Sequence, residues 1–525
     1  MKEVVAKEEI GAFLNGRDPQ KYIVGVEASN YSNKVHLIIN DPVRGKTIEP
    51  HRFRPFLWCN EAVWFRLYGG DRKRVKQEIA KAGIKVRKVK MCNSEGHIPD
   101  RIAQGYQYLV TGSSKQSIND LQNFFKWGGL GVWDNRDLFH MVAAPEQFMI
   151  QTGKRLFKGL EDYDDLHKFF FDLETTGLDP YVDRIFQVGI KDNRGFDHIL
   201  DVTTDAAEQK LSIPNPELSD EDNKKVRNRE LIELTEEEIL ELNDREMEAI
   251  NTFFSLIEHM RPDTISGYNS EDFDFNFFVV RCQVLGYDIK EVALTLSKFA
   301  KGTDYVEFKR NEKATIKLGQ ESQRYTQTLM WGFTVLDIAH SVRRAQAINS
   351  DIKAWGLKYI TQYADAEKPN RVYVQGDKIF TTWADKVSKF AFNESNGDWY
   401  KIDPEQISSG QNVIKEGYDE ATGKYIVERY LQDDLWETAK VDEIFNQSNF
   451  LLGKIVPTPY SRVSTMGTAA LWNLLMTAWS YEKGLAIPIH EDKRDFAGGL
   501  ARLLEVGYAI DVTKLDFAAL YPNIM

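Results

Sequence analysis

The sequence has few cysteines and contains no long apolar run. No stretch approaches the roughly 20 consecutive apolar residues that a membrane-spanning helix needs. The first residues, MKEVVAKEEIGAFLNG, are charged and lack the apolar core of a signal peptide. The three cysteines, Cys59, Cys92 and Cys282, are scattered along the chain, which argues against a disulfide framework or a zinc site. We therefore expect a protein of the cytoplasm (the host cytoplasm if the source is viral) with no membrane partner.

Charge is unevenly distributed. The formal net charge of −12 disfavours nucleic-acid binding, because phosphate contacts need basic surface. However, residues 51–100 carry 12 Lys and Arg against 5 Asp and Glu, whereas residues 201–250 carry 6 against 16. The acidic segment is interpreted as a solvated helix face. The basic segment has two open interpretations, a solvated helix face or a nucleic-acid channel.

Length and patterning predict several domains. A chain of 525 residues that is 42% hydrophobic exceeds what one core usually holds. Residues 1–166 mix short strands with helices and predict an α+β N-terminal domain. Strands then alternate with helices over 167–445, which favours an α/β domain with polar loops at 366–378 and 393–424. Residues 446–525 begin with helical segments.

Two carboxylates end the apolar strand in KFFFDLETTG. Because side chains alternate along a strand, Asp172 and Glu174 point to the same side. Like charges held side by side are unfavourable unless a cation lies between them. A D-x-E sequence alone is more often an exposed strand end, so the pattern needs support from elsewhere in the chain.

Two further acidic positions lie downstream. Asp274 follows Asn269 in ISGYNSEDFDFNFF and opens a predicted helix, where an isolated Asp is commonly an N-cap. Tyr430 and Asp434 in YLQDD are four residues apart and share one face of a helix. A phenol beside a metal-bound carboxylate could orient an attacking water, although such a pair alone is usually a pair of exposed surface residues without a catalytic role.

Taken together, FDLET, GYNSEDFDFNFF and YLQDD resemble the three exonuclease motifs of the family B DNA polymerases. The resemblance implies a ribonuclease-H-like 3′→5′ exonuclease domain over 167–445 that hydrolyses DNA with two Mg²⁺ or Mn²⁺ ions. The residue roles that it implies are metal binding for Asp172, Glu174 and Asp434, completion of the site by Asp274, water alignment by Tyr430, and DNA contact by Asn269 and Phe273.

The last thirty residues resemble the beginning of the same family's polymerase palm. FAGG at 496–499 stands where the family has Tyr-x-Gly-Gly, and DFAALYPNIM resembles the first polymerase motif. This resemblance implies template contact by Phe496, Gly498 and Gly499, metal binding by Asp516, also with two ions, and nucleotide binding by Phe517, Ala519, Leu520 and Tyr521.

The overall expectation is therefore a multidomain α/β and α+β chain from the front part of a replicative family B DNA polymerase with a proofreading exonuclease. The family's second palm acid and its fingers would lie beyond residue 525. We expect polymerisation, and dNTP binding, to need a C-terminal chain or the rest of a longer one. The expected partners are primer–template, single-stranded DNA and a sliding clamp. The alternatives are a stand-alone exonuclease and a non-catalytic DNA-binding subunit.

Overall fold

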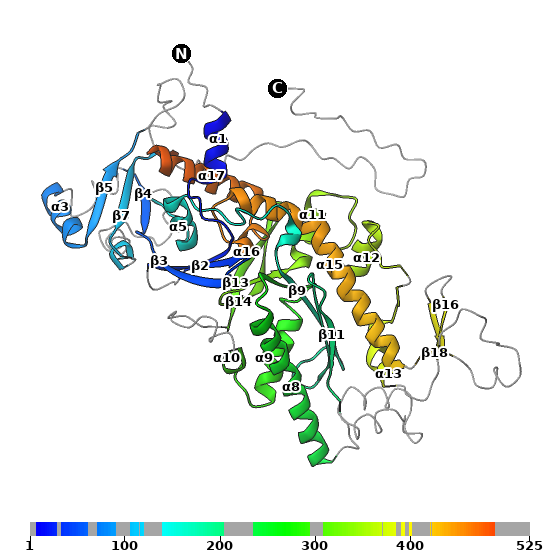
Figure 1. The fold of residues 1–525 in the computed structure, drawn as a ribbon. Helices are drawn as coiled ribbons and strands as arrows, with labels where there is room; N and C mark the ends of the chain where they lie inside the picture. Colours follow the sequence, from blue (N-terminus) through cyan, green and yellow to red (C-terminus); the bar gives the residue numbers. More distant parts are fainter. Residues whose placement is uncertain are drawn as a thin grey trace, which may run out of the picture.

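The computed structural model combines helices and strands throughout, so the mixed α and β composition predicted from the sequence is confirmed (Figure 1). The palm-like residues 496–525 lie outside the described part. The described residues are 7–28, 33–60, 71–90, 105–114, 116–119, 139–203, 235–293, 308–369, 371–384, 390–393, 398–401, 420–421 and 423–488.

The N-terminal part contains two antiparallel sheets. The first has the order β1-β2-β3 and the second β5-β7-β4-β8. Their strands are β1 (Ile23–Ala28), β2 (Lys34–Asp41), β3 (Gly45–Arg52), β4 (Phe56–Cys59), β5 (Ile84–Lys88), β7 (Tyr108–Gly112) and β8 (Phe139–His140). The accompanying helices are α1 (Lys7–Leu14), α3 (Arg72–Lys81) and α5 (Ala144–Thr152).

A late segment of the chain returns to this N-terminal part. Helix α17 (Thr468–Lys483) packs Leu471 and Leu474 into one core with Phe56 and Trp58. Strand β19 (Ile487–Pro488) pairs with β6 (Gly105–Tyr106). The N-terminal fold is therefore completed by residues that follow the central part of the chain.

The central sheet positions the candidate site. Its strand order is β11-β10-β9-β12-β15, in which β10 runs antiparallel to β9 and to β11, and β12 runs parallel to β9 and to β15. Its strands are β9 (Lys168–Thr175), β10 (Ile185–Asp192), β11 (Asp197–Asp201), β12 (Thr264–Gly267) and β15 (Thr334–Asp337).

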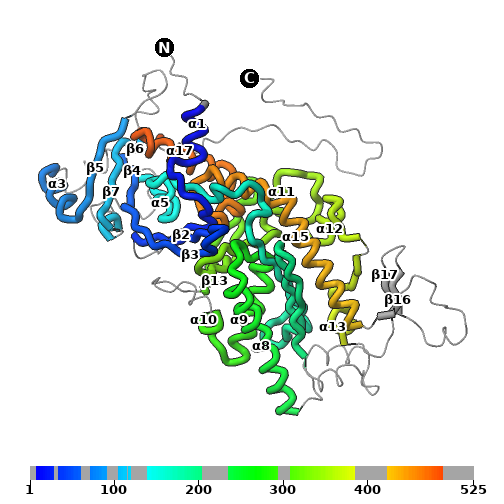
Figure 2. The backbone as a smooth tube through the Cα atoms, viewed as in Figure 1, coloured from blue at the N-terminus to red at the C-terminus, as the bar shows by residue number. Residues whose placement is uncertain are grey.

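Helices cover both faces of this sheet, because its strands are apolar on both sides. On one face, α8 (Glu236–Met260) and α9 (Asp274–Val284) pack Phe253 and Phe278 against Phe171 of β9. On the other, α11 (Ile338–Ile348) and α15 (Gly423–Ile455) pack against Phe170. Figure 2 shows α15 running diagonally alongside α11.

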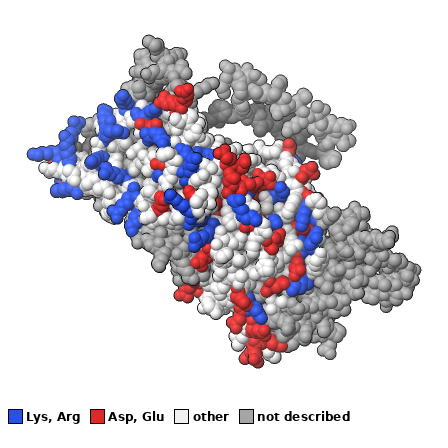
Figure 3. All heavy atoms as spheres, in the orientation of Figure 1, with Lys and Arg blue, Asp and Glu red and all other residues white. Residues whose placement is uncertain are grey.

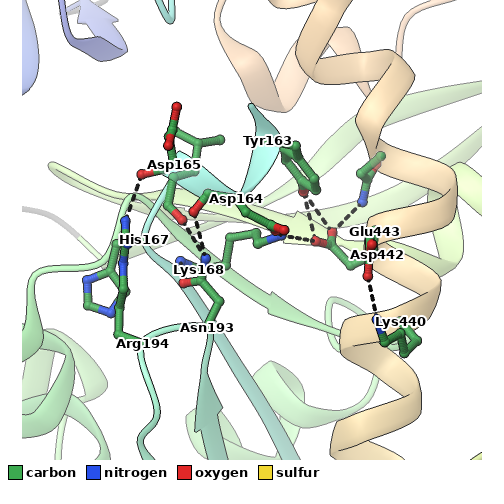
Figure 4. Close-up of polar contacts among 12 residues, drawn as sticks. Tyr163, Asp164, Asp165, His167, Lys168, Asn193, Arg194, Lys440, Asp442 and Glu443 are labelled. Carbon is green, nitrogen blue, oxygen red and sulfur yellow. Dashed lines mark hydrogen bonds and ion pairs between the residues drawn. The ribbon is translucent and has the colours of Figure 1, made fainter. Parts of the chain in front are cut away.

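A buried polar network joins α15 to the beginning of β9 (Figure 4). Asp442 of α15 accepts hydrogen bonds from the Tyr163 hydroxyl at 2.8 and 3.0 Å and lies 3.9 Å from the Lys168 ammonium. Lys168 also pairs with Asp164 at 2.6 Å. Because a buried carboxylate needs such partners, this network fixes where α15 lies relative to β9.

The remaining elements surround this frame. A long hairpin is formed by β13 (Phe308–Leu318) and β14 (Glu321–Met330). The other described elements are η3 (Tyr163–Asp165), α10 (Ile289–Val292), α12 (Leu357–Tyr363), η5 (Gly376–Lys378), α13 (Ile379–Trp383), β16 (Phe390–Asn393), β17 (Asp398–Lys401), β18 (Glu420–Ala421) and α16 (Tyr460–Val463). Within the described ranges, no helix is both long and apolar enough to cross a membrane.

Candidate active site

The end of β9 presents two carboxylates to the α15 face of the sheet. Phe169, Phe171 and Leu173 point into the core under α8 and α9. Alternation turns the residues between them, together with Asp172 and Glu174, to the opposite face. The same-side placement predicted from the sequence therefore follows from the burial of this strand.

The third carboxylate comes from α15. One carboxylate oxygen from each of Asp172, Glu174 and Asp434 lies within 4.8 Å of the other two. Glu174 and Asp434 are only 7% and 6% exposed, and Asp172 is half-buried. A helix far along the chain thus completes a cluster that a strand begins.

Asp274 joins this cluster through a shared hydrogen bond. The Leu173 N–H lies 3.1 Å from the Oδ1 atoms of both Asp172 and Asp274. The helix N-cap is Phe273, and the Asp274 carboxylate makes no capping bond. The N-cap interpretation of Asp274 is therefore wrong, because its side chain is directed to β9 instead.

The crowded acids hold their protons more tightly than ordinary carboxyl groups. Burial, reinforced by Asp274 and Asp434, raises the pKa of Asp172. Burial and Asp434 likewise raise the pKa of Glu174, and burial raises the pKa of Asp274 to about 8. Such shifts are typical of buried carboxylates that lie close to one another.

Tyr430 lies one turn before Asp434 on the same face of α15. Its hydroxyl accepts a hydrogen bond from the ammonium of Lys358 in α12, which also lies 4.3 Å from the centre of the ring. Burial, with Asp434 and Glu174 nearby, raises the pKa of Tyr430, so the phenol stays protonated. A neutral phenol can donate or accept a hydrogen bond beside the carboxylates.

A second cation reaches the cluster from the segment before η5. Arg371 is 3% exposed, donates to Asp434, and lies 3.0 Å from Glu437 through its Nε atom. Burial opposes its charge, but Asp434 and Glu437 outweigh that effect and raise the pKa of Arg371. One guanidinium group therefore holds the carboxylates of two successive turns of α15.

Asn269 and Phe273 lie in the turn that leads into Asp274. Asn269 has a φ of +61°, a left-handed conformation that few residues other than glycine adopt readily. Asp337, at the end of β15, stabilises this turn by accepting hydrogen bonds from the N–H groups of Asn269 at 2.9 Å and Glu271 at 3.1 Å. Both Asn269 and Phe273 are half-buried beside the cluster.

Sequence reasoning missed Lys358, Arg371 and Asp337. Lys358 lies in DIKAWGLKYI, a segment between the second and the third of the three motifs. A single lysine in such a segment does not by itself indicate a functional site. Eight predicted site residues cannot be placed, because Phe496, Gly498, Gly499, Asp516, Phe517, Ala519, Leu520 and Tyr521 lie outside the described residues.

Part of this chain is similar to a known protein family. Residues 156–360 match the family model for the exonuclease domain of DNA polymerase family B. DNA polymerase 2 of Aeropyrum pernix is 24% identical over 291 residues, which cover 55% of this chain and 29% of that protein. The DNA polymerase of Pyrococcus glycovorans is 24% identical over 296 residues, covering 54% and 30%.

A solved structure shares the fold. The family B DNA polymerase of Pyrobaculum calidifontis superposes with a TM-score of 0.52 at 14% identity, over 90% of this chain and 51% of that one. The resemblance to family B DNA polymerases is thus confirmed, and within this chain residues 156–360 are the part that matches the exonuclease domain of that family. The chain spans about 30% of the length of these two curated relatives.

Proposed function

We propose that this chain removes nucleotides from the 3′ end of DNA by metal-dependent hydrolysis, as the proofreading part of a family B polymerase. The observation that carries the proposal is the carboxylate cluster. Asp172, Glu174 and Asp434 offer oxygens within 4.8 Å of one another, and the first two lie in the residues that match the family's exonuclease domain. The non-catalytic alternative gives no reason to hold three acids so close.

The donor set fits hard divalent cations. The cluster contains carboxylate oxygens only, which suit Mg²⁺ or Mn²⁺ better than zinc. Asp172, Glu174 and Asp434 would hold two ions, with Asp274 completing the site. When bound, the metal supplies positive charge for the attacking and leaving oxygens of a phosphodiester.

The remaining residues act by orientation. Tyr430 would align the attacking water, and the Lys358 hydrogen bond would fix the direction of its hydroxyl. Arg371 would hold Asp434 in place through its contact with that carboxylate. Asn269 and Phe273 would contact the DNA strand near its 3′ end.

The domain assignment is part of this proposal. The strand order β11-β10-β9-β12-β15, with β10 reversed relative to β9, supports a ribonuclease-H-like domain at 167–445. It would follow an N-terminal domain at 1–166 and precede a helical linker and palm beginning at 446–525. Polymerisation, dNTP binding by the segment around Asp516 and recruitment of a sliding clamp belong to the proposed whole polymerase.

The test is an exonuclease assay on a primer–template whose 3′ nucleotide is mismatched. With Mg²⁺ the chain should remove the mismatched nucleotide, and chelation should stop the reaction. Asp172→Asn should abolish removal, whereas Glu443→Gln, which neutralises an exposed acid on α15, should not. A wild-type chain that is inert with Mg²⁺ and Mn²⁺, or an Asp172→Asn variant as active as wild type, would refute the proposal.

A further inference from the structure

The turn that carries Asn269 and Phe273 is held from two sides. On one side, Asp337 of β15 accepts hydrogen bonds from the N–H groups of Asn269 and Glu271. On the other side, the carboxylate of Glu271 reaches the hairpin of β13 and β14. Glu271 is only 2% exposed and lies outside the carboxylate cluster. A buried carboxylate therefore links this turn to a separate element of the fold.

Two residues of the hairpin bind this carboxylate. Arg310 of β13 and Thr328 of β14 face each other in register. Thr328 donates to Glu271 Oε2 from its N–H at 2.7 Å and from its hydroxyl at 2.5 Å. The guanidinium group of Arg310 lies 3.3 Å from the same oxygen and also donates to the Glu271 carbonyl oxygen at 2.5 Å. Both the side chain and the backbone of Glu271 are thus bound to the hairpin.

The hairpin can act as an anchor because it is itself bound to other elements. The ring of Tyr325 packs 4.4 Å from that of His340 in α11. The Lys317 N–H donates to the carbonyl oxygen of Thr465 at 3.0 Å. Helix α11 follows directly after Asp337 at the end of β15. The two supports of the turn therefore belong to one connected unit.

The backbone of the turn needs such support. Asn269 has a φ of +61°, and a residue other than glycine keeps this conformation only where its surroundings enforce it. The bonds from Glu271 to Arg310 and Thr328 are buried, directional and partly charged, so they fix a conformation more strongly than neutral hydrogen bonds do. Strained conformations of this kind are concentrated at functional sites.

We propose that Glu271 is a positioning residue for the 3′ end of the DNA strand. Held by Arg310 and Thr328, it enforces the turn that presents Asn269 and Phe273. The inference rests on the proposed function, which assigns DNA contact to those two residues. It adds that their orientation depends on a buried clamp formed with the hairpin.

The clamp acts on DNA binding and not on the metal site. Asp274 follows the turn, but its helix, α9, is anchored independently, because Phe275 and Phe278 are buried in the core below the sheet. Loss of the clamp therefore loosens Asn269 and Phe273 and leaves the acids of the cluster in place.

The assay must report on the 3′ end itself, because DNA is also attracted to other parts of the surface. Figure 3 shows Lys and Arg gathered over the β5 and α3 end of the molecule, at the left of the view. Attraction to such a surface does not depend on where a strand ends. A fluorescent purine analogue at the 3′ terminus of a short single strand restricts the signal to the terminal base.

The test measures binding of this oligonucleotide to the full chain in EDTA. Arg310→Met and Glu271→Ala should each weaken binding about 10- to 100-fold, the equivalent of one hydrogen bond to a charged group. Thr328→Val removes only a hydroxyl and should weaken binding less. Glu271→Gln, which keeps an acceptor oxygen, should restore most of the affinity lost in Glu271→Ala. The matched control is Lys309→Met, which replaces an exposed cation next to Arg310 on β13 and should bind like wild type.

Two further readouts separate positioning from general support of the fold. With Mg²⁺, Arg310→Met should raise KM for the oligonucleotide and leave kcat within about twofold of wild type, the pattern of lost binding rather than lost chemistry. Calorimetric titration of the same variant should show unchanged Mn²⁺ affinity. Circular dichroism confirms that each variant is folded.

Wild-type affinity in folded Arg310→Met and Thr328→Val variants would overturn the proposal, and so would an equal loss in Lys309→Met. Loss of Mn²⁺ binding together with DNA binding would show that the clamp only supports the fold. A wild-type chain that does not bind the 3′ end would refute both the clamp and the proposed exonuclease. A wild-type chain that binds the end without hydrolysing it would refute the exonuclease alone, and the binding comparison would still decide the role of Glu271.

Discussion

Gly189 of β10 sets how closely α15 approaches the central sheet. A methyl group at this position would lie 2.8 Å from both Leu431 Cγ and Leu435 Cδ1, whereas carbon atoms pack at about 3.5–4.0 Å. Gly189→Ala should therefore push α15 outward by about 0.7 Å or more. Gly189 pairs in register with Asp172, and α15 carries Asp434, so the shift acts directly on the carboxylate cluster.

The expected effect on activity is larger than the effect on stability. Overpacking of a core destabilises by about 1–3 kcal/mol, whereas a misplacement near 1 Å can lower a rate about 100-fold. We expect Gly189→Ala to lower kcat/KM by about 10- to 100-fold, with a higher Mg²⁺ requirement. Exonuclease rates over a Mg²⁺ series, with urea unfolding on the same samples, measure both effects.

The matched control is Gly11→Ala, since a methyl group there meets nothing within 4 Å. It should leave both the rate and the stability close to wild type. Wild-type activity in a folded Gly189→Ala variant would refute the reasoning, because it would mean that the approach of α15 does not determine the geometry of the cluster.

Three further predictions concern buried charges. Glu246 is fully buried and pairs with Arg281 at 2.7 Å. The Glu246→Gln substitution should therefore lower the free energy of unfolding, measured in urea, by about 3–5 kcal/mol. Lys358→Met should remove the hydrogen bond to Tyr430 and lower kcat about 10- to 100-fold in the exonuclease assay. Burial raises the pKa of Glu27 from 4.5 to about 8. Between these two pH values the folded protein keeps a proton on Glu27 that the unfolded chain releases. The stabilisation that Glu27 contributes at low pH is therefore lost as the pH rises from 4.5 through 8. Glu27→Gln should remove that decline in unfolding experiments at each pH.

Each of these has its own contrary result. Glu248, which forms an exposed ion pair with Arg245, serves as the control for Glu246. Glu248→Gln should change the free energy of unfolding by less than about 1 kcal/mol, and equal effects of the two substitutions would contradict the buried-pair argument. An unchanged kcat in Lys358→Met would remove its positioning role. Parallel pH–stability curves for wild type and Glu27→Gln would show that this carboxyl is not perturbed in the folded state.

Short-range patterns were enough to predict much of the central sheet and the α15 face. β9, β10 and β12 are apolar runs, and the pleat alone puts Asp172 and Glu174 on one side. The helical spacing of Tyr430 and Asp434 was equally local. These features depend on neighbours in the sequence, which is why the sequence displays them.

Features that depend on distant contacts could not be predicted. The β13–β14 hairpin is rich in Lys, Arg, Glu and Gln and buries few side chains, among them Ile316 and Tyr325, so its strand pattern is faint. Arg371 lies in a stretch that reads as a polar loop, and only the fold brings it to Asp434. The domain boundaries and the palm residues stay predictions.

The central claim is that carboxylates from β9 and α15, more than 250 residues apart in the sequence, form one metal site. Calorimetric titration with Mn²⁺, in the absence of DNA, tests it most directly. The wild-type chain should bind Mn²⁺, and Asp434→Asn should lose or greatly weaken that binding while the Glu443→Gln control retains it. Undiminished binding by a folded Asp434→Asn variant, or none by wild type, would contradict the claim.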